Sequence, residues 1–279
     1  MLDLHTHSTA SDGQYSPAAL VQLAARKGVT TLALTDHDTT AGLAEAEQAA
    51  AQCGIRLIAG IELDTKYPGV RGNFHMLGYG IDPQHPALAA QCADFAAQRQ
   101  ARAERIFTYL ESFGIRLDRE KVFGYAGDGV IARPHFARVM LESGYVAEIQ
   151  EAFDRYLDTP EFQTIDRPKP HPREAIQTIR QAGGIPVLAH PFQLKLGERD
   201  LPSLLRELKE YGLGGLECYY STHTAQQTEM LLALAEQYGL CITGGSDFHG
   251  EKIKPQIALA TGIDNTLRVR STLPLCLSE

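Results

Sequence analysis

The chain has 279 residues, of which 44% are hydrophobic and 22% charged, enough to bury a normal core in one large domain with or without an insertion. Its net charge of −8 argues against a broad basic surface for duplex nucleic acid. No apolar run reaches the roughly 18 residues of a membrane span, and the N-terminus lacks the basic and apolar regions of a secretory signal.

The cysteines are odd in number, widely spaced and without a C-x-x-C pair. They are Cys53, Cys92, Cys218, Cys241 and Cys276. This pattern predicts reduced side chains in the core or at the surface. With no secretory signal, it also predicts a cytoplasmic protein.

Strands and helices alternate through the first 80 residues. The predicted strands are Met1–Leu4, Thr30–Leu34, Ile55–Ile61 and Phe74–Tyr79. A first helix opens at Ser16-Pro17, an N-cap followed by a first-turn proline, and Gly28 suits its exit. An alanine-rich second helix covers Gly42–Gln52.

From about residue 86 to residue 162 the periodicity is helical, with almost no strand signal. The predicted helices are Leu88–Ser112, Phe136–Ser143 and Ile149–Tyr156. We therefore predict a helical insertion over residues 86–164. It is expected to cover one mouth of the main domain as a substrate cap.

Alternation returns after the proline-rich connection at residues 166–172. The predicted elements are helix Glu174–Gln181, strand Ile185–Ala189, helix Leu201–Tyr211, strand Leu216–Tyr219, helix Ala225–Tyr238 and strand Leu240–Thr243. Strands that alternate with helices imply a parallel sheet or a (β/α) barrel. We expect residues 1–85 and 165–279 to form this domain.

Histidines and carboxylates recur where the predicted strands end. The candidates are His5, His7, Asp12, His37, Glu62, His75, His190, Asp247 and His249. Active sites of parallel β/α folds are built at this edge, and residues two apart on an extended strand point the same way. His5 and His7 can therefore face one ion. A lone histidine at a strand end is usually structural, but chance poorly explains the whole set.

Imidazole and carboxylate are the ligands that Zn²⁺, Mn²⁺ and Fe²⁺ share. Nine candidates are too many for one ion, so we predict two to three divalent transition metals, with Glu62 able to bridge two of them. Metals about 4 Å apart generate a hydroxide at neutral pH and clamp the attacking and leaving oxygens. Phosphoryl transfer needs that charge neutralisation, so the pattern predicts a metal-dependent phosphoesterase.

These motifs resemble the polymerase and histidinol phosphatase (PHP) family. They are H-x-H at His5 and His7, Ser11–Gly13, T-D-H-D at Thr35–Asp38, G-x-E at Gly60–Glu62, His75, A-H-P at Ala189–Pro191 and G-S-D-x-H at Gly245–His249. The resemblance implies a distorted (β/α)7 TIM-like barrel with a trinuclear site. It implies one ion on His5, His7, Glu62 and Asp247, a second on Glu62, His75 and His190, and a third on Asp12, His37 and His249.

Within the insertion, Arg133-Pro-His135 resembles the branch of 3′,5′-nucleoside bisphosphate phosphatases and 5′-to-3′ exoribonucleases of short RNA. The resemblance implies that Arg133 and His135 hold phosphate, which an arginine fork suits. The chain departs from the branch at residues 158–161, where acidic residues replace a basic turn. Either Arg167 or Lys169 supplies that charge, or both are plain charges of the linker. The expected substrate is a small phosphorylated molecule, a nucleotide or short oligonucleotide.

The resemblance implies removal of the 3′-phosphate of a nucleoside 3′,5′-bisphosphate, giving a nucleoside 5′-monophosphate. Glu62, His190 and Asp247 would form the catalytic centre, and a metal-bound water, His190 or His223 would protonate the leaving group. His223 is also a candidate phosphate contact; otherwise it is a loop histidine. Which of these groups gives the proton stays open.

Three alternatives remain at this point. A 5′-to-3′ exoribonuclease on short RNA is the nearest. An amidohydrolase also begins with H-x-H, but it usually needs a bridging lysine or carboxylate in mid-barrel, and the predicted strands contain no lysine. A non-enzymatic regulatory barrel would be expected to have lost ligands, whereas this chain keeps a full set.

Overall fold

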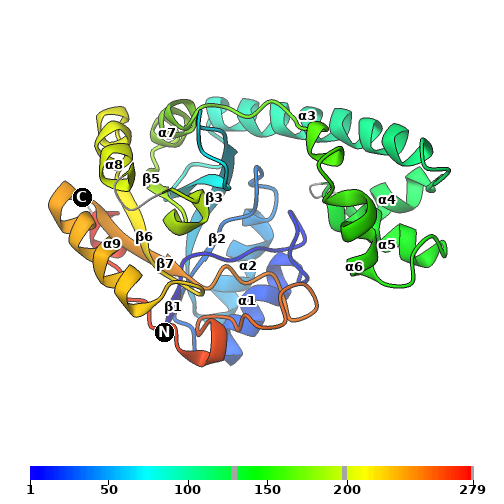
Figure 1. Cartoon of the computed structure of the whole chain (residues 1–279). Helices are drawn as coiled ribbons and strands as arrows, with labels where there is room; N and C mark the ends of the chain where they lie inside the picture. Colours follow the sequence, from blue (N-terminus) through cyan, green and yellow to red (C-terminus); the bar gives the residue numbers. More distant parts are fainter. Residues whose placement is uncertain (127–130, 197–199, 278–279) are drawn as a thin grey trace. The chain divides into compact units, whose positions relative to one another are not determined.

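The strands form a single seven-stranded sheet, in chain order, in the computed structural model, which describes residues 1–126, 131–196 and 200–277. They are β1 (Leu2–Asp3), β2 (Thr31–Leu34), β3 (Arg56–Thr65), β4 (Phe74–Tyr79), β5 (Ile185–Leu188), β6 (Gly215–Tyr220) and β7 (Cys241–Gly245). The first and last strands meet where Leu4 N donates to Gly244 O (3.2 Å) and His7 N to Phe248 O (3.0 Å). The sheet thus closes almost completely, and the predicted distorted barrel is confirmed (Figure 1).

One strand runs against the others, contrary to a simple alternation of strands and helices. β4 is antiparallel to both β3 and β5, and Asp64 pairs with His75 in its register. The connection between β3 and β4 is an eight-residue loop, 66–73, too short for the helical crossover that a parallel pair needs. Because β4 is reversed, its first residues lie at the same edge as the last residues of β3.

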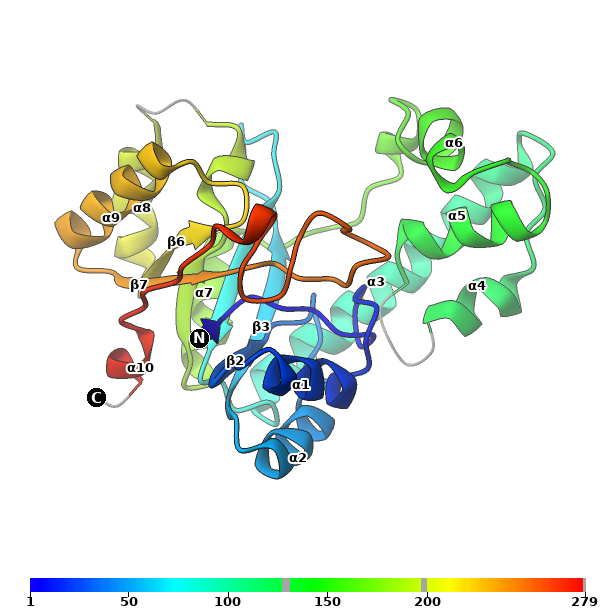
Figure 2. The same cartoon turned by 90° about the horizontal axis from the view of Figure 1, so that it is seen from below.

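Six helices belong to the barrel unit within the described residues. They are α1 (Pro17–Arg26), α2 (Leu43–Cys53), α7 (Pro172–Gln181), α8 (Asp200–Tyr211), α9 (Ala225–Tyr238) and α10 (Leu273–Cys276). Ser16 caps α1 as predicted, since its Oγ accepts from Ala19 N at 3.3 Å. α1 and α2 pack together and α9 packs on β6, so apolar helix faces cover the outside of the sheet (Figures 1 and 2).

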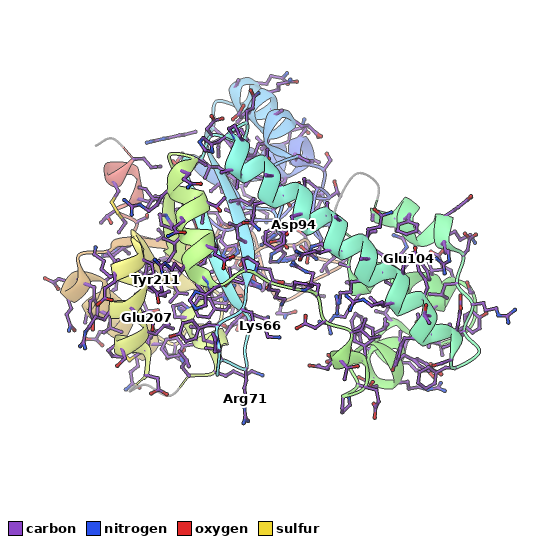
Figure 3. All side chains as sticks on the ribbon, turned by 90° about the horizontal axis from the view of Figure 1, so that it is seen from above. Lys66, Arg71, Asp94, Glu104, Glu207 and Tyr211 are labelled. Carbon is purple, nitrogen blue, oxygen red and sulfur yellow. A yellow bond between two sulfur atoms is a disulfide. The ribbon has the colours of Figure 1, made fainter. Side chains whose placement is uncertain are left out.

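The loop between β3 and β4 is fastened to the helices beside it. Lys66 N donates to Pro170 O at 3.0 Å. Tyr67 donates to one oxygen of Glu207 on α8 at 2.5 Å, and Tyr211, one turn later, donates to the other at 2.6 Å. Figure 3 shows Glu207 and Tyr211 together on α8. These bonds restrain the loop that joins the two strands carrying Glu62 and His75.

The chain divides into two compact units, Met1–Gln91 with Lys169–Glu279, and Cys92–Pro168. The second unit holds most of α3 (Pro86–Glu111), then α4 (Arg119–Ala126), α5 (Arg133–Glu142), α6 (Ile149–Ala152) and a π-helix, Phe153–Leu157. Its core is separate from that of the barrel and includes Phe107, Leu110 and Phe136. The helix α4 was not predicted from the sequence. The predicted helix Ile149–Tyr156 corresponds to α6 together with the π-helix that follows it directly.

Short 3₁₀ segments complete the described elements: Phe162–Thr164, Pro191–Leu194 and Ile263–Asn265. In the parts of the chain that the structure describes, no helix combines the length and apolarity needed to cross a membrane.

The expectation that all cysteines are reduced is wrong for one pair. Cys241 and Cys276 form a disulfide with their Cα atoms 6.7 Å apart. The C-terminal segment returns to β7, where Thr272 N donates to Ile242 O and Ile242 N donates to Thr272 Oγ1. This pairing brings together two cysteines 35 residues apart, a proximity that spacing alone does not reveal.

We expect the Cys276→Ser variant to lose about 3 kcal/mol in free energy of unfolding, because the bond closes a long loop in the unfolded chain. Urea unfolding without reductant measures the loss, and Cys53→Ser, which removes a free thiol, is the matched control. Thiol titration of the denatured, unreduced protein should find three thiols, those of Cys53, Cys92 and Cys218. Five reactive thiols would contradict the disulfide.

Candidate metal centre

The centre begins where the chain leaves β1. His5 and His7 are buried, and their ring centroids lie 5.2 Å apart. Thr6 between them turns the other way and donates its hydroxyl to Ala33 O at 2.7 Å. The period of two in an extended chain thus aims both imidazoles to one side, as the sequence predicts.

Glu62 lies at the middle of the centre. Its carboxylate is 1% exposed and faces five imidazole rings. The oxygen–nitrogen distances are 2.8 Å to Nδ1 of His75, 2.9 Å to Nε2 of His190, 3.1 Å to Nδ1 of His37, 3.2 Å to Nε2 of His5 and 3.3 Å to Nε2 of His7. The first two rings face Oε1 and the other three face Oε2, so the carboxylate has the placement of a bridge.

Two of the predicted strand-end residues reach the centre differently from the expectation. β3 runs on to Thr65, so Glu62 lies inside the strand and not at its end. His75 is the second residue of β4. It reaches the same edge only because β4 is antiparallel to β3.

The segment after β7 contributes Asp247 and His249 to the centre. Oδ1 of Asp247 lies 3.1 Å from His7 Nε2 and 3.5 Å from both His5 Nε2 and His249 Nδ1. Its other oxygen, Oδ2, accepts from Tyr220 Oη and from Lys254 Nζ, each at 2.7 Å. Oδ1 is therefore the oxygen that remains for a ligand role.

All nine predicted ligands come together in four overlapping groups. The groups are His7, Asp12, His37 and His249; His5, His7 and Asp247; His5, Glu62 and His190; and His37, Glu62 and His75. The candidate ligand atoms of each group lie within 4.8 Å of one another. The groups place His5 with Glu62 and His190, and His37 with Glu62 and His75, so their overlaps differ from the three sets implied by the resemblance.

Several buried imidazole nitrogens lack a good hydrogen bond within the protein and could instead bind a metal ion. Within the described residues, both ring nitrogens of His7 and Nδ1 of His37 are buried and make no hydrogen bond of good geometry, although Asp247 lies 3.1 Å from Nε2 of His7 and Glu62 lies 3.1 Å from Nδ1 of His37. A buried polar atom without a partner costs free energy, and native proteins rarely leave one so. A divalent cation would use the one lone pair that each neutral ring offers, so the donor set fits the metals that the strand-end histidines and carboxylates predict.

Burial and the neighbouring carboxylates shift the pKa values of the candidate histidines in opposite directions. Burial would lower the pKa of His7, but Asp247 and Glu62 outweigh it and raise that pKa to about 9. Burial likewise opposes, and Glu62 and Asp64 raise, the pKa of His75, to about 10. Burial prevails at His37 and lowers its pKa to about 3. Metal binding would therefore displace protons from the raised histidines.

Two candidate ligands have backbone angles that side-chain-bearing residues rarely adopt. His190 has φ 27° and Asp247 has φ 57°. Such conformations cost on the order of 1–3 kcal/mol and persist where the surroundings enforce them, often at functional sites. Here the unusual turns aim the side chains back toward Glu62 and His7.

The remaining predicted residues lie outside the four groups. Nδ1 of His223 donates to Cys218 O at 3.1 Å, and burial lowers the pKa of His223. Nζ of Lys169 lies 3.0 Å from Oδ2 of Asp64. In the second unit, Arg133 donates to Asp158 at 2.9 Å, and Nδ1 of His135 accepts from Ala132 N at 3.2 Å.

Among the described residues, sequence reasoning missed Asp64, whose Oδ1 lies 3.5 Å from Nε2 of His75, and three further residues that contact the candidate ligands. Tyr220 and Lys254 bind Asp247, and Glu217 binds His5. Glu217 had a usable signal, because it is a charged residue inside the apolar strand Gly215–Tyr220 and a buried charge needs a partner. Lys254 had none, since it lies in a polar loop that resembles ordinary surface.

Comparison with known proteins agrees with this geometry. Residues 3–159 match the PHP domain family. The chain is 39% identical over 247 residues to the 5′-3′ exoribonuclease of Haemophilus influenzae, covering 88% of this chain and 89% of that protein. It is 34% identical over 249 residues to the 3′,5′-nucleoside bisphosphate phosphatase of Chromobacterium violaceum, covering 89% and 87%.

A solved structure from Bifidobacterium adolescentis, assigned as a metal-dependent phosphoesterase, matches the fold. The TM-score is 0.82 at 31% sequence identity, and the match covers 95% of this chain and 92% of that one. The family match covers six of the nine candidate ligands, and the structural match extends over nearly the whole chain.

Proposed function

Because the chain belongs to the PHP family and is a phosphoric ester hydrolase, we propose that it removes the 3′-phosphate of a nucleoside 3′,5′-bisphosphate, leaving a nucleoside 5′-monophosphate. The observation that carries the proposal is one buried carboxylate, Glu62, ringed by five imidazoles within 3.3 Å. The similarity to the Chromobacterium violaceum phosphatase supports this substrate class.

The nine residues of the four groups would hold two to three divalent ions, with Glu62 shared between them. Such ions, when bound, acidify water and neutralise the charge of a phosphoryl group. The protein's own part is to fix the ligands and to shield them from water. Tyr220 and Lys254 hold Oδ2 of Asp247, so that Oδ1 keeps facing His5 and His7.

His223 is proposed to act as a hydrogen-bond acceptor in the substrate site. Its Nδ1 donates to a carbonyl, which leaves Nε2 with a free lone pair, and the lowered pKa keeps the ring neutral at pH 7. Nε2 is buried without a partner in the described structure. A ring in this state accepts from a water or a substrate hydroxyl, so it is poorly suited to protonate the leaving group.

The second unit is proposed to supply phosphate-binding groups. Arg99, Arg102 and Arg133 line one small pocket there. Burial and, after it, the neighbouring Arg133 lower the pKa of Arg102 to about 10. Asp158 now accepts from Arg133, and a phosphate with its larger charge would compete for that fork. On the barrel unit, Lys169 is a further cation that we propose to bind phosphate.

We expect Arg133→Ala to raise KM for a nucleoside 3′,5′-bisphosphate about 10- to 100-fold, because a charge-assisted hydrogen bond to phosphate is lost. The change in kcat should be smaller, and steady-state kinetics separate the two. Arg138→Ala is the matched control, since Arg138 lies on the same helix, is 59% exposed and pairs with Glu142. Equal effects of the two substitutions would contradict a phosphate role for Arg133.

A second candidate is stepwise removal of nucleotides from the 5′ end of short RNA. The 39% identity to the Haemophilus influenzae exoribonuclease favours it. The two activities are separated by offering the reconstituted enzyme a nucleoside 3′,5′-bisphosphate and, in parallel, a short 5′-phosphorylated RNA. The proposal predicts the higher kcat/KM on the bisphosphate. Turnover of neither substrate would overturn both candidates.

A further inference from the structure

A buried glutamate inside β6 touches two candidate ligands without being one. Glu217 is 0% exposed and belongs to none of the four ligand groups. Its Oε1 lies 2.9 Å from Nδ1 of His5, and its Oε2 accepts from the backbone N of His190 at 2.6 Å. Each oxygen thus serves a different ligand, one through its ring and the other through its main chain.

We infer that Glu217 is a positioning residue that fixes the tautomer of His5 and the backbone turn of His190, so that Nε2 of both rings faces Glu62. The inference rests on the proposed metal centre. A carboxylate only accepts hydrogen bonds, so Nδ1 of His5 must carry the proton. Nε2 of His5, 3.2 Å from Glu62, is then the nitrogen left to bind an ion.

The contact with His190 acts through the backbone. His190 has φ 27°, a conformation that an isolated residue seldom holds. The short bond from its N–H to the ionisable carboxylate of Glu217 restrains that turn. With the turn in place, Nε2 of His190 lies 2.9 Å from Oε1 of Glu62. The carboxylate of Glu217 therefore orients two candidate ligands, His5 toward Oε2 of Glu62 and His190 toward Oε1.

If Glu217 only stabilised the packing of β6, its replacement would not change the affinity for metal. The Glu217→Gln variant therefore distinguishes a packing role from a positioning role. The glutamine has the same length but only one acceptor oxygen for two N–H donors. Either His5 moves its proton to Nε2 and loses the lone pair that faces Glu62, or His190 N loses its acceptor and the turn relaxes. Both outcomes weaken metal binding.

The experiment titrates the metal-free full-length protein with Mn²⁺ and follows free Mn²⁺ by electron paramagnetic resonance. Glu217→Gln is expected to bind at least one Mn²⁺ about 10- to 100-fold more weakly than the wild type, as is usual when a group that orients a ligand is removed. Thr243→Val is the control. Thr243 is the cross-strand partner of Glu217 on β7, is buried, and donates to Leu216 O.

The control removes a buried hydrogen bond at the same place in the sheet but touches no candidate ligand, so its Mn²⁺ affinity should match the wild type. Unchanged affinity in Glu217→Gln, or an equal loss in Thr243→Val, overturns the inference. Should circular dichroism show that Glu217→Gln is unfolded, Glu217→Asp decides. It keeps the charge but is one methylene shorter and cannot reach both donors, so wild-type affinity in that variant also overturns the inference.

The wild-type titration distinguishes a failure of the proposed metal centre from a failure of the positioning role of Glu217. Fewer than two bound equivalents in the wild type with Mn²⁺, Fe²⁺ and Zn²⁺ alike would refute the proposed centre itself, whatever Glu217 does. Two or more in the wild type, with the same affinity in Glu217→Gln, would refute only the positioning role.

Discussion

Replacing Glu62 with glutamine is expected to lower kcat/KM by at least about 10,000-fold, or about 5.5 kcal/mol of transition-state stabilisation. Glu62 takes part in two of the four ligand groups, so its loss affects more than one ion. The amide keeps the size of the side chain but removes the charge that five imidazoles face, and its nitrogen is not a ligand. We expect the bound metal to fall by at least one equivalent.

Glu207→Gln is the control for this substitution. Glu207 also accepts two hydrogen bonds, from Tyr67 and Tyr211, but belongs to no ligand group. Its kinetics should stay within about twofold of the wild type, as for surface substitutions that leave the site intact. A Glu62→Gln enzyme with full metal content and more than a tenth of wild-type kcat/KM would show that Glu62 is not the bridge.

Asp247→Asn is expected to lower kcat/KM at least about 1,000-fold, or about 4 kcal/mol, with the fold intact. Tyr220 and Lys254 both donate to Oδ2, so the carbonyl oxygen of the asparagine would take that position. The amide NH₂ would then point at His5 and His7, where a ligand oxygen is needed. Asparagine tolerates positive φ, so the backbone at 57° should not be disturbed.

Circular dichroism and thermal unfolding of the metal-free protein test whether the fold survives. Asp82→Asn is the matched control, because Asp82 accepts from Gln84 N in an exposed turn and lies outside the ligand groups. If Asp247→Asn loses activity but keeps its bound metal, Asp247 is not a metal ligand and contributes to activity in another way. Retention of both would refute its place in the centre.

The candidate ligands could be predicted from the sequence because most of them follow the ends of strands that alternate with helices. A strand that alternates with helices delivers its last residues to one edge, so His5, His37 and Asp247 identify that edge from local pattern alone. The structure brings all nine predicted ligands into the four groups. Glu62 and His75 obey the rule only indirectly, through the antiparallel hairpin of β3 and β4.

What the sequence could not provide depends on contacts between distant segments. Glu217 is 212 residues from His5 in the chain, so its place inside an apolar strand indicates a buried carboxylate but does not reveal its partner. The disulfide of Cys241 and Cys276 arises from the return of the C-terminal segment to β7. The helix α4 lies in the second unit, where packing around Val122 and Phe136 decides the ends of short helices more than local propensity does.

Metal content of the full-length protein tests the central claim most directly. The chain would be freed of metal, reconstituted separately with Mn²⁺, Fe²⁺ and Zn²⁺, desalted, and measured by inductively coupled plasma mass spectrometry. A centre built around a bridging Glu62 predicts two to three equivalents of at least one of these ions, with phosphatase activity rising as they bind. Fewer than two equivalents with every metal, or full activity in the metal-free protein, would contradict it.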